Sequence, residues 1–456
     1  FVDLNCLLPG DPGTVDTTAG EFCGEFKIEN TLPPQKNIPD FKNGIAPNFQ
    51  IGDPNLPDDE VFASPVEPGQ RRETHRVFLD YIQDFGEWTS TLKTAYNKDD
   101  YESAYDLDHQ QVRAIWGLFA FNEQNEYEDY AIEWSVESPV DAPVRGKLGV
   151  YYFDFERNFR NRSFAGPNAL FSVPPGANFG DDRIDETTNQ SVFGSVGIDL
   201  AEQWELLIEA RYAKDEKDIT SGQRDLAGVS MPVSDSREFT NFTPRLTVNF
   251  RPTDDVLMYG LVSKGNKPGG FNQELFRSDV PSSYTQYAVD CVPGVTPEPS
   301  IPDIETDCAT VKGRLTFEEE EQWTYEAGFK STWFDRRVVA NFSAFYIDWT
   351  NQGIFNTTFV PSASGTPTPV VVLENAGKSK IVGFELESNF AVTDNLFLIA
   401  NYGYNDGEYT EGESPDQGEK TGDADISGNT IAQSPKHSIV LGMEATAPVG
   451  ATTDAF

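Results

Sequence analysis

The three histidines, His75, His109 and His437, are the side chains best suited to acid–base chemistry or metal binding at neutral pH. They lie far apart in the sequence, and no GxSxG or HExxH motif is present. The nearest Gly-rich element, Gly265–Asn272, follows a predicted strand and does not join a strand to a helix, so a phosphate loop is a poor interpretation. These residues predict no enzyme, no catalytic site, no metal site and no cofactor.

The four cysteines form two pairs, Cys6 with Cys23 and Cys291 with Cys308, with the same spacing within each pair. Both pairs lie in segments rich in Pro, Gly and Asp, which are typical of loops. Neither pair has the CxxC spacing of a zinc site. We therefore expect two local disulfides formed in an oxidising compartment, the alternative being four free thiols.

The chain is strongly acidic, with 34 basic and 74 acidic residues and a net charge of -40. This balance argues against a nucleic-acid partner, because phosphates need Lys and Arg. It fits a solvated acidic surface, or alternatively the attraction of cations to the loops. Glu318–Glu321 is the densest acidic run, but without EF-hand spacing it is a weak candidate for divalent ions.

The elements that would position these residues follow a repeat of strand, tight turn, strand and long polar loop. Its clearest copy runs from Gln322 to Trp349 and turns at Phe334–Arg337. Odd positions along the first half are apolar and even ones polar, as a two-faced strand requires. A second copy comprises Ile381–Ala391 and Leu396–Tyr409. Short turns at one end and long loops at the other are typical of a transmembrane antiparallel β-barrel, an all-β fold.

The same rhythm extends along most of the chain and predicts about 13 strands. These are Glu73–Asp84, Trp88–Tyr101, Glu126–Ser138, Gly146–Asn158, Gln190–Asp199, Trp204–Lys217, Phe239–Phe250, Val256–Lys264, Gln322–Trp333, Val338–Trp349, Ile381–Ala391, Leu396–Tyr409 and His437–Ala445. The predicted long connections are Asp100–Asn125, Phe159–Asn189, Ile219–Glu238, Gly265–Glu321, Thr350–Lys378 and Thr410–Lys436. Residues 1–72 read as one long extracellular loop, and 73–456 as barrel strands and loops.

Aromatic residues gather at both ends of these strands, as at the two interfaces of a membrane. Near the short turns lie Phe85, Trp88, Trp204, Trp333 and Phe334. Near the long loops lie Tyr101, Phe155, Phe159, Tyr212, Phe239, Trp323, Trp349 and Tyr409. The alternative is that these rings belong to the core of a soluble β-protein.

No segment has the roughly 20 consecutive apolar residues of a membrane-spanning helix. The opening residues lack the basic start and apolar centre of a signal peptide. The first and last predicted strands both descend from long loops, so the sheet would have two open edges. Because unpaired edges cannot face lipid, we expect this sequence to be a fragment of a longer barrel.

The polar face of the predicted barrel carries charges of both signs. They are Glu209, Arg211, Arg245, Glu326, Lys330, Glu385 and Glu387. Such charges fit a solvated lumen wall or a ladder of salt bridges. They also fit a surface on which a plug inside the lumen docks reversibly, since hydrated ion pairs are individually weak.

Several stretches, taken in order, resemble the TonB-dependent outer-membrane receptors. Leu257–Asn272 resembles the family's YxSxSKGFKPGGFN strand and exit, and Phe317–Lys330 its PExxxxYExGxKS strand. Ala344–Trp349 resembles the return strand, and Asn375–Glu387 the NAGxAxxxGxExE strand. Ser434–His437 resembles the entry to a late strand. Each motif alone is weak, but their order is specific, and the clear matches cover about half of the chain.

The resemblance implies a barrel of about 22 strands with an N-terminal plug. This sequence would supply about 13 strands, roughly the sixth to the eighteenth, without the plug, the TonB box or the closing strands. It implies import of a scarce ligand across the outer membrane of a Gram-negative bacterium. The expected ligand is a ferric siderophore, haem, a vitamin or an oligosaccharide. The implied partners are TonB–ExbB–ExbD, acting through the plug, together with outer-membrane lipid and lipopolysaccharide.

Ligand contacts are expected among aromatic and polar residues of the long loops. The candidates are Phe159, Arg160, Phe164, Lys267, Phe271, Phe276, Tyr284 and Tyr287. The alternative for each residue is ordinary packing within its loop. The alternative for the whole protein is a passive porin or surface adhesin without a plug. A barrel enzyme lacks a plausible site, and a soluble β-sandwich would have to pack the apolar strand faces together.

Overall fold

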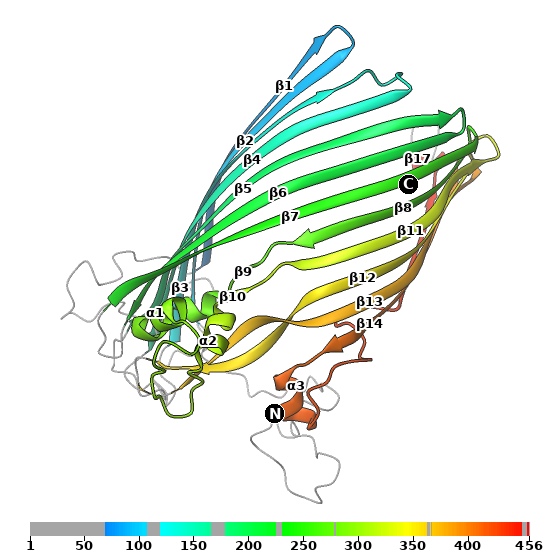
Figure 1. The fold of residues 1–456 in the computed structure, drawn as a ribbon. Coiled ribbons are helices and arrows are strands. Elements are labelled where there is room, and N and C mark those ends of the chain that lie inside the picture. The colour runs from blue at the N-terminus through cyan, green and yellow to red at the C-terminus, as the bar shows by residue number, and fades with distance from the viewer. Residues whose placement is uncertain are drawn as a thin grey trace, which may run out of the picture.

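The structure is a computed structural model that describes residues 69–106, 119–165, 178–224, 230–277, 280–362, 365, 367–448 and 454–455. Thirteen strands form one continuous antiparallel sheet in the order β1-β2-β3-β4-β5-β6-β7-β8-β11-β12-β13-β14-β15 (Figure 1). The predicted all-β class and the predicted number of strands are therefore confirmed. Short turns gather at one end of the curved sheet, and the helices α1 and α2 lie at the other.

The sheet strands are long and mostly adjacent in sequence. Their bounds are β1 Gly69–Phe85, β2 Trp88–Asp106, β3 Phe119–Glu137, β4 Val144–Ala165, β5 Asn178–Ala201, β6 Trp204–Arg224, β7 Ser230–Thr253, β8 Val256–Lys267, β11 Glu320–Trp333, β12 Val338–Val360, β13 Thr368–Thr393, β14 Leu396–Gly412 and β15 His437–Ala445. Two small pairs lie outside the sheet, β9 Gly270–Phe271 with β10 Thr316–Phe317, and β16 Ala447–Pro448 with β17 Asp454–Ala455.

The first predicted boundary, after residue 72, falls inside a strand, because β1 already begins at Gly69. Residues 1–68, which hold most of the predicted first loop, lie outside the described residues. The assignment of 73–456 to barrel strands and loops, and the location of the plug beyond this sequence, stay predictions.

The sheet has one polar face, which the pairing register defines. Residues directly opposite each other on neighbouring antiparallel strands point to the same side. Glu209 lies opposite Arg245, and Arg245 lies opposite Ser263 on the next strand. Following the register across the sheet places all seven charges expected in the lumen on this face: Glu209, Arg211, Arg245, Glu326, Lys330, Glu385 and Glu387.

The opposite, apolar face exposes large hydrophobic side chains along the middle of the sheet. They include Val150, Val192, Ile208, Leu246, Val382 and Leu386. A row of rings borders this band on the side away from the short turns: Tyr96 and Tyr130 lie opposite each other, and so do Tyr325 and Tyr346. An apolar band of this extent in water would be costly, so this face requires an apolar surrounding.

The predicted aromatic belt at the long-loop end is partly wrong. Tyr212 and Trp323 lie on the apolar face, whereas six others lie on the polar face by register: Tyr101, Phe155, Phe159, Phe239, Trp349 and Tyr409. The presence of aromatic residues near the strand ends does not show which face of the sheet they occupy. The face depends on whether a residue is at an odd or an even position of its strand, and a shift of one residue moves a side chain to the opposite face.

Strands also continue well into the predicted loops, and this overturns several predicted boundaries. β4 runs to Ala165, for example, and β13 begins at Thr368. Beyond the rings the apolar face becomes charged, with Glu128 opposite Glu156 and Glu156 opposite Glu186. Both faces are polar there, so alternation is lost from the sequence, although the backbone ladder that defines a strand persists.

The connection between β8 and β11 folds into a compact excursion, residues 270–317. It contains β9, the short helix η2 Gln273–Phe276, α1 Ser282–Asp290, α2 Cys308–Leu315 and β10. Its buried core includes Phe276 and Leu315. This core packs against Ile219 and Val233 on one side and against Val360 and Val372 on the other. The excursion therefore covers the polar face from β6–β7 to β12–β13 at the end away from the short turns.

Asn272 fastens this excursion to the sheet through its side-chain amide. The amide nitrogen donates to the backbone oxygens of Arg314, at 2.8 Å, and Leu373, at 2.9 Å, while its oxygen accepts from the Leu373 N–H at 2.8 Å. The Asn272 amide thus bonds both the N–H and the carbonyl of Leu373, as the backbone of a neighbouring strand would. Asn375 does the same for Glu318, accepting from its N–H at 2.6 Å and donating to its carbonyl at 3.0 Å.

A disulfide joins Cys291 after α1 to Cys308 at the start of α2, which confirms one of the two predicted bridges. The other predicted bridge is untested, because Cys6 and Cys23 both lie outside the described residues. A disulfide between Cys6 and Cys23 therefore stays a prediction. Lys312 in α2 adds a second link to the end of α1, because its ammonium group donates to the backbone oxygens of Val289 and Cys291, both at 3.1 Å.

Membrane-spanning helices were not expected from the sequence. Within the described ranges, no helix has both the length and the apolar character needed to cross a membrane.

The two faces should respond oppositely to the same charge. Leu386→Arg places a cation in the middle of the apolar face, which the sequence predicts to contact lipid, and should destabilise the sheet in a bilayer by about 2–4 kcal/mol. Glu385→Arg, one residue away on the polar face, is the matched control and should assemble normally. Assembly is measured as the heat-modifiable gel mobility of the full-length protein refolded in lipid vesicles. Equal behaviour of the two variants would contradict the assignment of faces.

Candidate functional site

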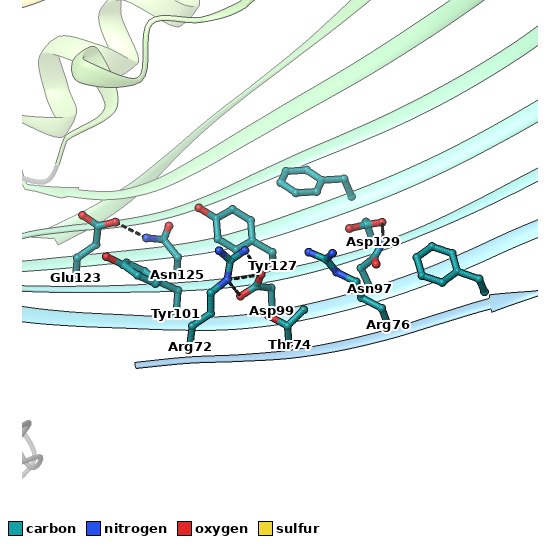
Figure 2. Close-up of a pocket in the computed structure, with 12 residues that line it drawn as sticks. Arg72, Thr74, Arg76, Asn97, Asp99, Tyr101, Glu123, Asn125, Tyr127 and Asp129 are labelled. Atoms are coloured by element: carbon teal, nitrogen blue, oxygen red, sulfur yellow. Dashed lines mark hydrogen bonds and ion pairs between the residues drawn. The ribbon is translucent and has the colours of Figure 1, made fainter. Parts of the chain in front are cut away.

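A concave pocket of about 670 Å³ lies on the polar face of β1–β4 (Figure 2). Its lining combines cations, carboxylates, amides and rings: Arg72, Thr74, Arg76, Phe78, Asn97, Asp99, Tyr101, Glu123, Asn125, Tyr127, Asp129 and Phe155. Its volume falls within the range of small-molecule sites. The alternation of these strands aims one side chain in every two at the pocket, so four strands supply the whole set.

The pocket is organised around the pair formed by Arg72 on β1 and Asp99 on β2. Nε of Arg72 donates to both carboxylate oxygens of Asp99, at 2.8 and 2.9 Å, and a terminal guanidinium nitrogen also contacts Asp99. The Arg72 side chain is 61% exposed and that of Asp99 is 11% exposed. Asp99 is thus the anchored partner, while much of the guanidinium surface remains open to the pocket.

Two amide–carboxylate pairs continue the polar lining onto β3. Asn97 donates to Asp129 at 2.7 Å, and Asn125 donates to Glu123 at 2.5 Å. Figure 2 shows these pairs at opposite ends of the row, with the ring of Tyr127 between them. An ionised carboxylate has about four acceptor positions, so each of these groups keeps capacity for a ligand.

A cluster of arginines and rings adjoins the pocket on β3–β5. Arg157 donates to Asn125 at 2.9 Å, and its guanidinium lies 5.5 Å from the ring centre of Tyr127 and 4.7 Å from that of Phe159. Arg183, opposite Phe159 on β5, lies 4.8 Å from the same ring. Both guanidinium groups pair with Asp185, at 3.8 and 3.0 Å. Phe159 is therefore a fixed support for two cations.

The predicted loop residues Phe159, Arg160 and Phe164 lie within β4. Phe159 points to the polar face beside the pocket, whereas Arg160 points to the other face and pairs with Asp182 at 3.2 Å. The side chain of Phe164 lies outside the described residues. The structure thus places one of these three residues near the pocket.

The other predicted ligand residues belong to the excursion or its root. Phe276 is fully buried, and Phe271 meets it edge to face at 5.8 Å. The hydroxyl groups of Tyr284 and Tyr287 donate to the backbone oxygens of Glu305, at 3.3 Å, and Thr306, at 3.0 Å. All four residues pack within the excursion, and their role as ligand contacts stays a prediction. None of them lines the pocket.

The acidic run Glu318–Glu321 is tied into ion pairs of its own. Lys267 pairs with Glu320 at 2.8 Å, the indole of Trp349 donates to Glu320 at 3.0 Å, and Lys264 pairs with Glu321 at 2.5 Å. Across the part of the chain that the structure describes, no group of three or more His, Cys, Asp or Glu is placed to hold a metal ion.

The seven lumen candidates share the polar face but form local pairs and not one site. Arg245 pairs with Glu209 at 3.5 Å, and Tyr259 donates to Glu326 at 2.5 Å. Arg211 donates to Asn189 at 3.1 Å, and Asn341 donates to Glu387 at 3.4 Å. They lie farther along the sheet than the pocket, on β6, β7, β11 and β13.

Sequence reasoning missed the pocket residues Arg72, Arg76, Asp99 and Tyr127. Arg72 fell in a predicted loop, and the others were treated as ordinary strand positions. The usable signal was the run of polar residues on one parity of β1–β3. It becomes visible once the strands are extended past the apolar band and placed in register.

Three groups in the excursion, Tyr284, Tyr287 and Asp307, have shifted pKa values, and desolvation raises that of Tyr287. Burial raises the pKa of Tyr284 to about 12. Asp307 precedes α2, and hydrogen bonds donated by the Thr310 N–H and hydroxyl hold the pKa of its carboxyl below the usual value. Asp307 is thus an N-cap that stays ionised and satisfies a free backbone donor of α2.

Comparison with known proteins adds a family match. Residues 28–451 match the family model described as TonB dependent receptor-like, beta-barrel. A curated relative, the metal-pseudopaline receptor of Pseudomonas aeruginosa, is 25% identical over 241 residues, which are 53% of this chain and 26% of that protein. The chain thus spans about a quarter of this relative's length.

Two solved structures share the fold. The ferric yersiniabactin uptake receptor of Yersinia pestis gives a TM-score of 0.59 at 14% identity, over 84% of this chain and 48% of that one. The siderophore receptor of Acinetobacter baumannii gives a TM-score of 0.53 at 16% identity, over 83% of this chain and 52% of that one. Identities this low establish the fold alone.

The Tyr284 pKa predicts a loss of stability at high pH. The phenol in the unfolded chain ionises near pH 10, whereas the folded one stays neutral until about 12. Stabilisation by the buried neutral phenol is therefore complete below pH 10 and is lost as the pH rises towards 12. Thermal unfolding followed by circular dichroism at pH 8, 10 and 11.5 should show a smaller alkaline loss in Tyr284→Phe than in wild type. Tyr287→Phe, which removes a more exposed phenol, is the control, and an equal loss in all three proteins would contradict the assignment.

Proposed function

Because the chain belongs to the TonB-dependent receptors, as β-barrel sequence of that family, we propose that the protein is an outer-membrane receptor that imports a scarce ligand. Energy for import comes from TonB–ExbB–ExbD acting through a plug. The relatives named above are receptors and uptake proteins, which supports transport over catalysis. The location that follows is the outer membrane of a Gram-negative bacterium.

The observation that carries this proposal is the division of one sheet into an apolar and a polar face, with the pocket on the polar one. The apolar face, bordered by its row of tyrosines, contacts outer-membrane lipid, and the charged strand ends beyond it lie at the level of lipopolysaccharide. The polar face lines the lumen. The end that carries the excursion is extracellular, because barrels of this kind have their short turns in the periplasm.

The excursion covers only one side of the extracellular entrance to the lumen. It covers the polar face from β6–β7 to β12–β13 and is held there by a buried core, the disulfide and the Asn272 amide. The pocket on β1–β4 lies outside this cover. An incoming ligand therefore meets the pocket first, whereas the arginine cluster around Phe159 lies against the excursion, whose Gln273 donates to Asp185 at 3.4 Å.

The plug docks on the deeper polar face, on the seven charged side chains assigned to the lumen. The Glu209–Arg245 pair illustrates why this contact is reversible. Its side chains are 36% and 49% exposed, and such hydrated pairs are worth about 0–1 kcal/mol each. A force transmitted through TonB can therefore release the plug without breaking the wall.

We propose that the ligand belongs to the same class as the ligands of two relatives. One is a metal-pseudopaline receptor, and another takes up ferric yersiniabactin. Both names describe a metal ion carried by an organic chelator. The balanced polar lining and the rings of the pocket on β1–β4 suit such a complex better than they suit an apolar ligand.

The test is TonB-dependent uptake. Cells expressing the full-length protein are given radiolabelled metals (⁵⁵Fe, ⁶⁵Zn and ⁶³Ni) in spent medium that contains the native chelators. We expect saturable uptake of at least one metal, lost on deletion of tonB and reduced about 10-fold by Arg72→Gln/Asp99→Asn, which removes both partners of the central pair. Lys93→Gln, a cation on the same face of β2 nearer the short turn, is the control.

The alternative of a passive porin or adhesin makes a different prediction. A porin would pass small solutes at a rate proportional to concentration and independent of tonB, and an adhesin would show no uptake at all. Either result, with normal assembly of the protein in the outer membrane, would overturn the importer proposal.

A further inference from the structure

The turn between β11 and β12 has an unusual backbone conformation. Phe334, Asp335 and Arg336 all have positive φ angles, of 56°, 54° and 66°. Residues with a Cβ seldom adopt this left-handed region, and Asn and Asp, not Phe or Arg, are the usual exceptions. The β1–β2 turn uses glycine for the same conformation, because Gly86 has a φ of 67°. The β11–β12 turn therefore retains three side chains where glycine would relieve strain.

The neighbouring turns hold this backbone from both sides. The N–H and the hydroxyl of Thr332 donate to the carbonyl and the carboxylate of Asp255, at 2.9 and 3.1 Å. On the other side, Arg337 donates to the carbonyl of Ala391 at 3.1 Å and to the carboxylate of Asp394 at 3.2 Å. A strained backbone persists where its surroundings over-determine it, and such positions cluster at functional sites. The turn thus presents its side chains from a fixed backbone.

The side chains of the turn are exposed, Phe334 to 77% of its surface. Within the described part of the chain, no hydrogen bond or ion pair engages the side chain of Asp335 or Arg336. The other arginines near the short turns each pair with a carboxylate: Arg145, Arg251 and Arg337. The turn therefore carries two adjacent, opposite charges that no described residue neutralises.

The turn lies where the apolar face ends. Trp333 lies opposite Val338, and Val338 lies opposite Phe390, so all three share the apolar face. Trp333 is 51% exposed and Phe390 is 36% exposed. With the short turns in the periplasm, this end of the apolar face meets the periplasmic leaflet of the outer membrane, which consists of phospholipids. Acyl chains then contact Trp333 and Phe390, and the headgroups lie at the level of the turn.

We propose that the β11–β12 turn binds the headgroup of phosphatidylethanolamine, with the phosphate on Arg336 and the ammonium group on Asp335, while Phe334 lies against the acyl chains. A guanidinium fork matches the oxygens of a phosphate, and an ammonium group has three N–H donors for a carboxylate. A headgroup with both charges satisfies both side chains at once. This site rests on the membrane orientation of the proposed function and goes beyond ligand import.

Other phospholipid headgroups fit the turn less well. Phosphatidylglycerol has a phosphate but no ammonium group for Asp335. Its net negative charge is also disfavoured at this end of the sheet, where the short turns carry many carboxylates: Glu87, Asp141, Glu202, Asp254, Asp255 and Asp394. Phosphatidylcholine has a quaternary ammonium group, which has no N–H to donate to Asp335. The turn thus selects a lipid by penalising the other two.

The test is native mass spectrometry of the full-length receptor in detergent, mixed with equal amounts of phosphatidylethanolamine, phosphatidylglycerol and phosphatidylcholine. Phosphatidylethanolamine should be retained at least about 5-fold in excess over each of the others. Asp335→Asn and Arg336→Gln should each abolish this preference, and Arg336→Lys should keep most of it. Arg251→Gln and Asp254→Asn, the corresponding changes at the β7–β8 turn, should leave it unchanged.

The double variant Phe334→Gly/Arg336→Gly separates lipid binding from formation of the turn. Glycine relieves the left-handed strain, so this variant should resist unfolding by urea in phosphatidylcholine vesicles better than wild type. It should nevertheless lose the preference for phosphatidylethanolamine. If the variant keeps the preference, the side chains of the turn do not bind the headgroup and the proposal fails.

Three further results would overturn the assignment. They are equal retention of the three lipids, stronger retention of phosphatidylglycerol, and displacement of the bound lipid by inorganic phosphate alone, which would indicate a site for free phosphate. If tonB-dependent uptake persists in any of these cases, the import function stands and this inference alone fails. A preference for phosphatidylethanolamine without tonB-dependent uptake would leave the lipid site standing and overturn the import proposal.

Discussion

The two faces of the sheet depend on the backbone hydrogen-bond ladder that joins thirteen strands from β1 to β15. A ladder with a period of two divides the residues of each strand between two faces, and a shift by one residue would exchange them. The register shifts in the sheet lie near the turns or beyond the apolar band, so the pairing keeps one parity on each face along the band and fixes the apolar band and the polar wall together. The pocket at Arg72 and Asp99 and the charges at Glu209 and Glu387 are therefore consequences of the same pairing, although they lie on distant strands.

The excursion between β8 and β11 is stabilised by different interactions. It leaves the ladder, and it is stabilised by burial of Phe276 and Leu315, a disulfide, and side-chain amides that replace backbone partners. Its contacts with both β6–β7 and β12–β13 cover part of the polar face and leave the pocket on β1–β4 open. The ladder thus provides two surfaces, and the excursion covers part of one of them.

The sequence was informative where one face is apolar. The alternation around Tyr325 and Leu386 predicted the strands, their number and the shared face of the seven charges expected in the lumen. It failed where both faces are polar, as around Arg160 and Glu186, because a ladder between polar strands leaves no periodic signal. It also did not reveal that Phe276 and Tyr284 are buried, since apolar residues of a long connection look alike whether they bind a ligand or fill a core. Arg72 and Asp99 were missed because their pairing is a contact between strands, which spacing along one strand does not reveal.

Hydroxyl-radical footprinting of the full-length receptor, with and without the metal chelate that its cells accumulate, would test the central claim most directly. The oxidation rates of Tyr101, Tyr127 and Phe155 should fall on binding, whereas those of Phe271 and Tyr287 in the excursion should stay the same. Protection confined to the excursion, with the wall of β1–β4 unchanged, would contradict the account of a fixed cover and an open ligand-binding wall.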